Sequence, residues 1–573
     1  MTTSGICEQF GFVRPRSRKH GSVSIASGWK MACALFVLCA ATAVVSPAQT
    51  FRTLVTLNGA DCCPGGPLVQ GLDGNFYGTE SFEVFKVTRS GVLTTLHSCP
   101  LCPDGWGYSG LTLGTDGNFY GTTTYGGGVF KVTPDGTLTT LYYFCPAGGL
   151  NCPDGEYPQG LIQASDGNFY GTTLAGGYNR YRCGGSSGAE CGTVFKITPS
   201  GVLTTLHNFC SRTNCADGFS PNGLVQGTDG NFYGTTGGGG DTQCNPPYGC
   251  GTLFRITPTG TLTTLRSFNA TNGRGPHSLV QGIDGNIYGA TGSGGTSTDC
   301  PSGCGTFFKI TPNGTLTTLL NFDGADSSGS GVLVQATDGN FYGIGSISEN
   351  CPFPEGCGTV FKMTPSGTVT TLHTFAARFA TPLWLVQATN GTFYGETLGG
   401  GAHGYATVFS LCVGLGWFVE TLPTTGTVGA TIQILGTDFT GATAVTFNGT
   451  PAPFTIISRT QIQTTVPSGA TTGSVKVTIP SGTPTSNKRF RVLPQMTSFS
   501  PTSGPAGTVV TITGVSLAQT TRIGIGGVSA SFTVVDDTTV TATVPTGATT
   551  GKKVVITTRG GNVASATTFT VTE

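Results

Sequence analysis

The chain has 573 residues, which is too long for one ordinary domain and predicts several units. Charged residues make up only 10%, and 28 basic residues balance 28 acidic ones, which argues against a nucleic-acid-binding protein. Apolar residues at 37% exclude general disorder, and 92 glycines among short runs of Thr, Val and Phe favour many short strands joined by tight turns.

Residues 1–48 have the pattern of a signal peptide. Basic residues such as Arg14, Lys19 and Lys30 precede an apolar run from Met31 to Val45, which is short for a membrane span. Small residues near its end predict cleavage after Ala48. We expect a secreted or cell-surface protein with no membrane span after cleavage; an uncleaved membrane anchor is the alternative.

Seven copies of one repeat fill the region that follows, and we assign it to a domain of residues 49–412. Each copy carries DGNFYG or a variant of it, preceded by a run such as LVQG and followed by runs such as VFKITP and GTLTTL. The marks begin at Asp73, Asp116, Asp166, Asp229, Asp284, Asp338 and Asn390.

Each repeat predicts four antiparallel strands, because Asp-Gly and Thr-Pro-x-Gly are turn signals between its apolar runs. Four strands in about 50 residues are typical of a propeller blade. The seventh repeat has no fourth strand, while Phe51–Leu57 resembles a fourth strand that lacks a blade. We therefore predict a seven-bladed β-propeller closed by the N-terminal strand.

The repeat resembles the GloVer-type tandem repeat of choice-of-anchor surface proteins and, more distantly, NHL-like and lyase-like propeller repeats. This resemblance covers residues 51 to 411. It implies export and surface display, without a defined activity.

A second internal repeat, with a register of 78 residues, occupies the C-terminal part. Pro423-Thr-Thr-Gly426 matches Pro501-Thr-Ser-Gly504, and the VPSGATTG segment at Val466 matches VPTGATTG at Val544. Short alternating strands between turn residues predict two Ig-like β-sandwiches, at 413–494 and 495–573. Their motifs resemble IPT/TIG domains, which implies spacer or accessory binding modules.

Three of the 20 cysteines lie in the leader, which leaves 17. Most of these form close pairs, and export favours local disulfides. Zinc is disfavoured, because no second pair follows at finger spacing; Cys62, Cys63 and Cys412 are left unassigned. The predicted disulfides are Cys99–Cys102, Cys145–Cys152, Cys183–Cys191, Cys210–Cys215, Cys244–Cys250, Cys300–Cys304 and Cys351–Cys357.

No catalytic constellation, cofactor motif or metal motif stands out, and we expect a protein that is not an enzyme. His97, His207 and His373 share one place in the repeat, which Tyr142 fills elsewhere, and this exchange favours an outer-strand surface. Two polar positions recur from blade to blade. The glutamines admit a channel ligand or ion, but more simply predict an amide ladder between blades. The cations admit an anion site, but more simply predict either side chains that lie over the adjacent blade or ion pairs with the turn aspartates. The glutamines are Gln70, Gln163, Gln226, Gln281, Gln335 and Gln387, and the cations are Lys86, Lys131, Lys196, Arg255, Lys309 and Lys362.

In an antiparallel meander, the variable connections that hold the cysteine pairs share one face. Recognition is usually placed on such loops. Aromatic and arginine side chains on these loops suit a glycan or protein partner. We expect the protein itself to be a monomer. The alternatives are a lyase-like or lactonase-like propeller enzyme and a spacer without a specific ligand. The candidate binding residues are Trp106, Tyr108, Tyr178, Arg180, Tyr181, Arg182 and Tyr248.

Overall fold

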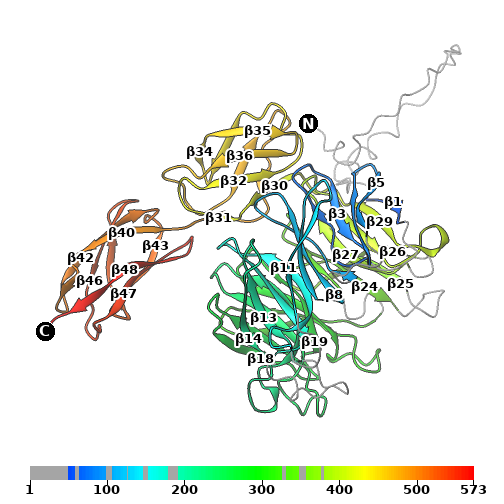
Figure 1. The fold of residues 1–573 in the computed structure, drawn as a ribbon, viewed down its shortest axis with the longest axis horizontal. Helices are drawn as coiled ribbons and strands as arrows, with labels where there is room; N and C mark the ends of the chain where they lie inside the picture. Colours follow the sequence, from blue (N-terminus) through cyan, green and yellow to red (C-terminus); the bar gives the residue numbers. More distant parts are fainter. Residues whose placement is uncertain are drawn as a thin grey trace, which may run out of the picture.

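The computed structural model describes residues 49–57, 64–98, 106–125, 127–145, 152–177, 191–324, 331–347, 357–375 and 380–573. The predicted signal peptide lies outside the described residues. In the described part the regular structure is β-strand apart from two short 3-10 turns, η2 (Thr213–Cys215) and η3 (Ala402–Gly404), which confirms the all-β prediction. A group of repeat sheets is followed by two sandwiches (Figure 1).

Six antiparallel sheets each come from one continuous stretch of chain, with strands in sequence order. In the second sheet, β6 and β7 both pair with β8, so its first strand is split in two. The first three sheets contain β2 (Val69–Gln70), β3 (Phe76–Thr79), β4 (Glu83–Val87) and β5 (Leu93–Ser98); β6 (Trp106–Tyr108), β7 (Thr112–Leu113), β8 (Phe119–Tyr125), β9 (Gly128–Val132) and β10 (Leu138–Tyr143); β11 (Glu156–Gln163), β12 (Phe169–Ala175), β13 (Thr193–Ile197) and β14 (Leu203–Asn208).

The fourth, fifth and sixth sheets repeat this order without the split strand. They contain β15 (Phe219–Gln226), β16 (Phe232–Gly238), β17 (Thr252–Ile256) and β18 (Leu262–Ser267); β19 (Arg274–Gln281), β20 (Ile287–Ser293), β21 (Thr306–Ile310) and β22 (Leu316–Asn321); β23 (Leu333–Gln335), β24 (Phe341–Ile347), β25 (Cys357–Met363) and β26 (Val369–Phe375).

The seventh sheet joins the two ends of the repeat region. Its strands β27 (Pro382–Gln387), β28 (Phe393–Thr397) and β29 (Thr407–Cys412) are completed by β1 (Thr50–Thr56), which pairs antiparallel with β29. Phe51 lies opposite Leu411, and Thr56 lies opposite Thr407. The predicted closure by the N-terminal strand is confirmed.

The Phe-Tyr pair of each repeat packs neighbouring sheets together. Tyr77 of the first sheet stacks on Phe119 of the second, with ring centroids 4.1 Å apart, and Phe76 meets Tyr394 of the seventh at 4.0 Å. Ile287 replaces the Phe in the fifth sheet and belongs to the same buried cluster as Tyr233. The other junctions are Tyr120–Phe169, Tyr170–Phe232, Tyr288–Phe341 and Tyr342–Phe393.

The glutamine and aspartate positions hold turns and join sheets. Gln70 donates to Gly74 O within its own sheet, and its Oε1 accepts from the Thr389 amide of the seventh sheet at 3.0 Å. Equivalent acceptors, such as Gln226 for the Ser165 amide, confirm the predicted amide ladder. Lys86 lies 2.7 Å from Asp73, and Lys196–Asp166 and Lys362–Asp338 are two more ion pairs, so these three cations take the second of the two expected arrangements.

The first sandwich has its own apolar core from Val419 to Val492. Its strands form an eight-stranded arrangement that runs through β30, with a separate parallel pair of β31 and β39. They are β30 (Phe418–Leu422), β31 (Thr425–Gly426), β32 (Thr431–Leu435), β33 (Ala444–Phe447), β34 (Thr450–Ala452), β35 (Phe454–Ser458), β36 (Gln461–Thr465), β37 (Val475–Thr478), β38 (Thr485–Ser486) and β39 (Arg491–Val492).

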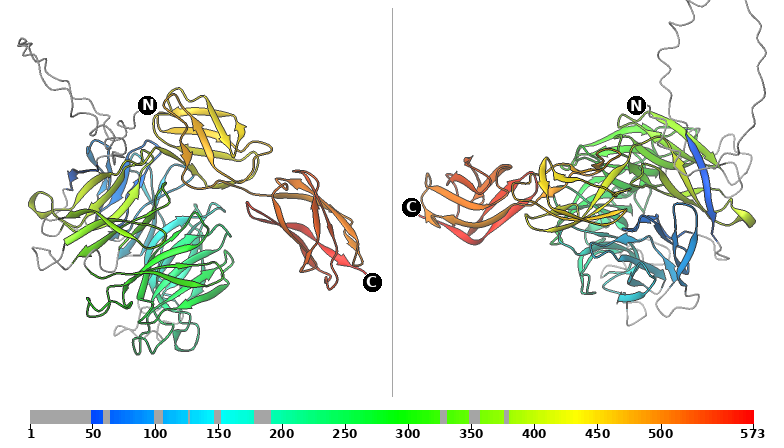
Figure 2. Two further views of the ribbon diagram at one scale, coloured as in Figure 1. Left: turned by 180° about the vertical axis from the view of Figure 1, so that it is seen from behind. Right: turned by 90° about the horizontal axis from the view of Figure 1, so that it is seen from above.

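The second sandwich packs a four-stranded sheet against a five-stranded one, around a core from Phe499 to Phe569. It extends away from the repeat sheets in every view, whereas the first sandwich lies beside them (Figures 1 and 2). Its strands are β40 (Gln495–Ser500), β41 (Ser503–Gly504), β42 (Val509–Val515), β43 (Thr520–Ile525), β44 (Val528–Ala530), β45 (Phe532–Val534), β46 (Thr539–Thr543), β47 (Lys552–Thr558) and β48 (Asn562–Val571).

Candidate functional site

The repeat sheets present two faces with different connections. We call the face with the first-to-second and third-to-fourth strand turns the turn face, and the opposite one, with the longer connections, the loop face. The first sandwich contacts the turn face at three sheets. Arg491 Nη1 donates to Thr228 O of the fourth sheet at 2.6 Å, and Thr460 donates to Leu72 O of the first at 2.7 Å. In the seventh sheet, Thr389 O accepts from the Phe418 amide.

The loop face carries four disulfides whose two cysteines are both described. The structure confirms four predicted pairs: Cys145–Cys152, Cys210–Cys215, Cys244–Cys250 and Cys300–Cys304. Cys191 is also disulfide-bonded, but its predicted partner Cys183 lies outside the described residues. So do Cys99, Cys102, Cys351 and the side chain of Cys357. Cys412, which the sequence left unassigned, is disulfide-bonded as well.

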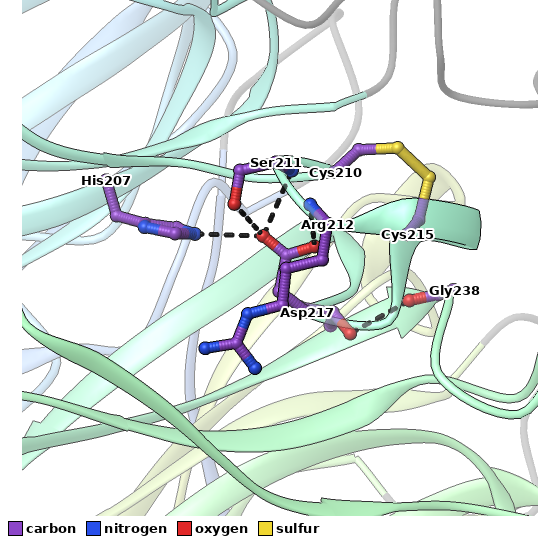
Figure 3. Close-up of a disulfide and its surroundings, with 8 residues drawn as sticks. His207, Cys210, Ser211, Arg212, Cys215, Asp217 and Gly238 are labelled. Atoms are coloured by element: carbon purple, nitrogen blue, oxygen red, sulfur yellow. Dashed lines mark hydrogen bonds and ion pairs between the residues drawn. A yellow bond between two sulfur atoms is a disulfide. The ribbon is translucent and has the colours of Figure 1, made fainter.

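The disulfide Cys210–Cys215 closes a loop around a buried carboxylate (Figure 3). Asp217 Oδ2 lies 3.1 Å from His207 Nε2 and accepts from the Ser211 hydroxyl at 2.6 Å and from the Ser211 amide at 3.1 Å. Burial raises the pKa of Asp217, but these hydrogen bonds outweigh it and hold the pKa below its ordinary value. The carboxylate therefore acts as a charged anchor for the loop.

The preceding sheet repeats this anchor with a different partner. Asp154 Oδ2 accepts from the Tyr142 hydroxyl at 2.9 Å and from the Cys145 amide at 3.1 Å, beside the disulfide Cys145–Cys152. Tyr142 and His207 hold the same place in the repeat. The exchange between them thus reflects two ways of holding a loop aspartate.

The three histidines lie on the fourth, outer strand of their sheets, as expected, and each is only partly exposed. His207 is mostly buried against Asp217. His373 stacks on Phe51 of the closing strand, with ring centroids 3.8 Å apart. His207 therefore anchors a loop, whereas His373 packs against β1.

The predicted binding residues have different outcomes. Tyr248 is exposed on the loop face, with 41% of its surface accessible, and its part in binding stays a prediction. The prediction for Tyr108 is wrong. Its side chain is buried and packs edge-on against Phe130 at 5.2 Å, because β6 pairs with β8 and so makes Tyr108 part of the second sheet. Trp106 begins β6, but its side chain lies outside the described part. Tyr178, Arg180, Tyr181 and Arg182 also lie outside the described residues.

The sequence reasoning missed other exposed aromatic residues of the loop face. Tyr125 and Tyr157 are exposed and pack edge to face at 5.8 Å, bridging the second and third sheets. Tyr157 has a φ of 55°, where the equivalent residues are Ser220 (φ 53°) and Gly275 (φ 58°). A bulky residue in the left-handed region is uncommon. The sequence offered one sign of this residue: the third repeat has EYP where the next two repeats have FSP and RGP, so a tyrosine stands where they have Ser or Gly.

One group of side chains has metal-ligand character. The ligand atoms of Cys145, Cys152 and Glu156 all lie within 4.8 Å of one another. The two sulfurs are joined in a disulfide, so they do not offer the thiolates that metal binding requires. This group gives no support for a metal centre.

Comparison with known families agrees with this architecture. The Gloeobacter/Verrucomicrobia repeat matches residues 41–185 and 180–409. The chain belongs to this repeat family. IPT/TIG domains match 419–492 and 494–571, so the two sandwiches of this Gloeobacter/Verrucomicrobia repeat protein are TIG domains. No curated protein matches its sequence.

Solved structures that resemble this repeat protein share little sequence identity with it. A streptogramin B lyase is 15% identical, with a TM-score of 0.44, over 63% of this chain and 97% of that one. Virginiamycin B lyase from Staphylococcus aureus is 14% identical, with a TM-score of 0.46, over 64% and 99%. These likenesses concern the fold alone. Within the described residues, no helix is both long and apolar enough to cross a membrane.

Proposed function

We propose that this repeat protein is an exported binding protein, not an enzyme, and that it recognises an extracellular glycan with the loop face of its propeller. The observation that carries the proposal is the asymmetry of the two faces. The first TIG domain contacts the turn face at the first, fourth and seventh sheets. The loop face carries the stiffened connections, where recognition is usually placed.

The chemistry of the loop face supports a saccharide ligand. Tyr125, Tyr157 and Tyr248 are exposed there, and tyrosine offers both an apolar ring and a hydrogen-bonding hydroxyl. Disulfides order several of the surrounding loops before binding, which reduces the entropy lost on association. The TIG domains then serve as a spacer, with the second one extended away from the propeller (Figure 2).

The experiment is a binding screen of residues 49–573 against a panel of glycans and cell-wall fractions. Tyr157→Ala and Tyr248→Ala should each weaken binding of the captured ligand by about tenfold, the loss of roughly 1.4 kcal/mol of contact. Val202→Ser is the matched control, because Val202 is 63% exposed but lies in a turn on the opposite face.

A protein that binds nothing in the panel would contradict the proposal and favour a passive spacer. Binding that is lost in Val202→Ser but kept in both tyrosine variants would also overturn it. Turnover of a panel substrate by the purified chain would contradict the assignment as a non-enzyme.

A further inference from the structure

A depression of about 380 Å³ opens on the loop face of the fifth sheet. One wall is Arg274, the first residue of the innermost strand β19. The other wall is the loop between β20 and β21, which contributes Ser297, Thr298, Cys300 and Ser302. Its volume is near the lower end of the range for small-ligand sites.

Arg274 brings an unmatched cation to this depression. Its Nε atom is buried and has no hydrogen-bond partner. The one acid of the loop, Asp299, is turned back on the loop itself, where it accepts from the Ser297 hydroxyl at 3.1 Å. No carboxylate of the described residues forms an ion pair with Arg274. A guanidinium left in this state favours an anionic partner from outside the chain.

The loop that faces Arg274 is held in place before any ligand arrives. The disulfide Cys300–Cys304 closes it, and the Gly294 amide donates to Ser302 O at 2.8 Å. Gly303 packs so tightly on Gly294 that a Cβ would lie 2.3 Å from the Gly294 oxygen. The depression is therefore a built feature of the fifth sheet, with little ordering left to be done on binding.

Folding does not require an arginine at this place. The equivalent first residues of the inner strands are Trp106, Glu156 and Phe219, each paired with the matching position of its second strand. Phe219 is buried over Gly238, whereas Arg274 is partly exposed. The backbone pairing at this position is common to these sheets, but the side chain that occupies the position differs in size and charge.

We propose that the Arg274 depression binds the acidic group of a saccharide. The planar guanidinium matches a carboxylate or sulfate in a two-pronged geometry. The exposed hydroxyls of Thr298 and Ser302 suit the sugar hydroxyls around that group. This inference rests on the proposed glycan-binding function and adds the ligand class and one residue that selects it.

The test is a titration of residues 49–573 with three probes: an oligogalacturonate, its methyl ester and chondroitin sulfate. The free oligogalacturonate or the sulfated glycan should bind, and the neutral ester should bind at least tenfold more weakly. Arg274→Gln should weaken binding of the acidic probe by tenfold or more. The affinity of Arg274→Lys should fall between those of the wild type and Arg274→Gln, because lysine keeps the positive charge but lacks the two-pronged guanidinium. Arg266→Gln, an exposed change of equal charge on the adjacent sheet, should bind like the wild type.

Each outcome separates the two proposals. Equal binding of the acid and the ester, or wild-type binding by a folded Arg274→Gln, overturns the acidic-saccharide site. If the chain binds only neutral glycans of the wider panel, the glycan-binding function stands and this inference falls. A preference for the oligogalacturonate over chondroitin sulfate identifies a carboxylate ligand, and the reverse preference a sulfate.

Discussion

One residue that departs from the repeat, Glu396, places a buried carboxyl group between two sheets. Glu396 stands in β28 where other sheets have Thr79, Thr122, Thr172 or Thr235. It is fully buried, and neither of its carboxylate oxygens has a hydrogen-bond partner. Burial, together with the nearby charge of Glu80, raises the pKa of Glu396 well above its ordinary value. The junction between the first and seventh sheets thus contains a carboxyl group that is costly to ionise.

This gives a pH dependence of definite sign. In the unfolded chain Glu396 titrates near 4.5, whereas the folded protein keeps its proton to higher pH. The folded state therefore binds more protons above pH 4.5, and its stability falls as the pH rises toward the folded pKa. Glu396→Gln should raise the melting temperature at pH 8 by a few degrees, corresponding to about 1–3 kcal/mol, and flatten its pH profile.

Thermal unfolding between pH 4.5 and 8.5 measures this difference. Glu83→Gln is the control, because Glu83 lies near the same junction but is partly exposed and accepts a hydrogen bond from Thr95. It should keep the wild-type profile. An unchanged profile in Glu396→Gln would show that Glu396 does not titrate between the folded and unfolded states as described.

The glycine of the FYG motif gives a second prediction at the residue scale. A Cβ on Gly234 would lie 2.4 Å from the Phe254 ring, which fills the space over it, whereas Gly223 on the neighbouring strand has nothing within 4 Å. Gly234→Ala should lower the free energy of unfolding by about 1–3 kcal/mol through overpacking. Gly223→Ala should be nearly neutral. Equal denaturation midpoints for the two variants would contradict this account of the motif.

At the scale of elements, the sequence predicted most of the strands, because each repeat carries turn residues at fixed offsets from its apolar runs. The closing strand was predictable because Phe51–Leu57 has the pattern of a fourth strand without a blade. The burial of Tyr108 was not, because Gly107 and Gly110 gave no sign that β6 continues the sheet. The anchors on Asp154 and Asp217 were not predictable either, because the cysteine spacing does not show that the aspartate two residues after each second cysteine hydrogen-bonds back to the fourth strand.

Closure by β1 predicts that the N-terminal strand supports the whole ring. Phe51 contacts His373 of the sixth sheet and Phe409 of the seventh, so removing residues 49–56 exposes both. Losing such a ring costs about 3–5 kcal/mol, which should lower the melting temperature by roughly 10 °C or more. Deleting residues 495–573 is the control and should leave the propeller transition in place. A synthetic Thr50–Thr56 peptide should restore part of the lost stability. A truncated chain that melts like the intact one would refute closure.

At the scale of the whole molecule, the docking of the first TIG domain was beyond sequence reasoning. It is made by residues far apart in the chain, such as Arg89 with Thr437 and Thr460 with Leu72. Neither the repeat pattern nor the TIG motif marks these residues. Their consequence is functional, since a domain fixed on the turn face orients the loop face away from the TIG pair.

Arg491 is the contact on which this arrangement can be tested. It is buried, and its guanidinium donates to Thr228 O on the fourth sheet, far along the chain from the contacts at the first and seventh sheets. Hydrogen bonds to charged groups are worth about 1.5–3 kcal/mol, so Arg491→Ala should loosen the docked domain without unfolding it. Small-angle scattering of the full chain should then show a larger radius of gyration. Arg459→Ala is the control, because that side chain is 79% exposed and pairs with Asp438 within its own domain. If both variants scatter like the wild type, Arg491 does not hold the TIG domain on the turn face, and the loop face loses its distinction as the free side of the propeller.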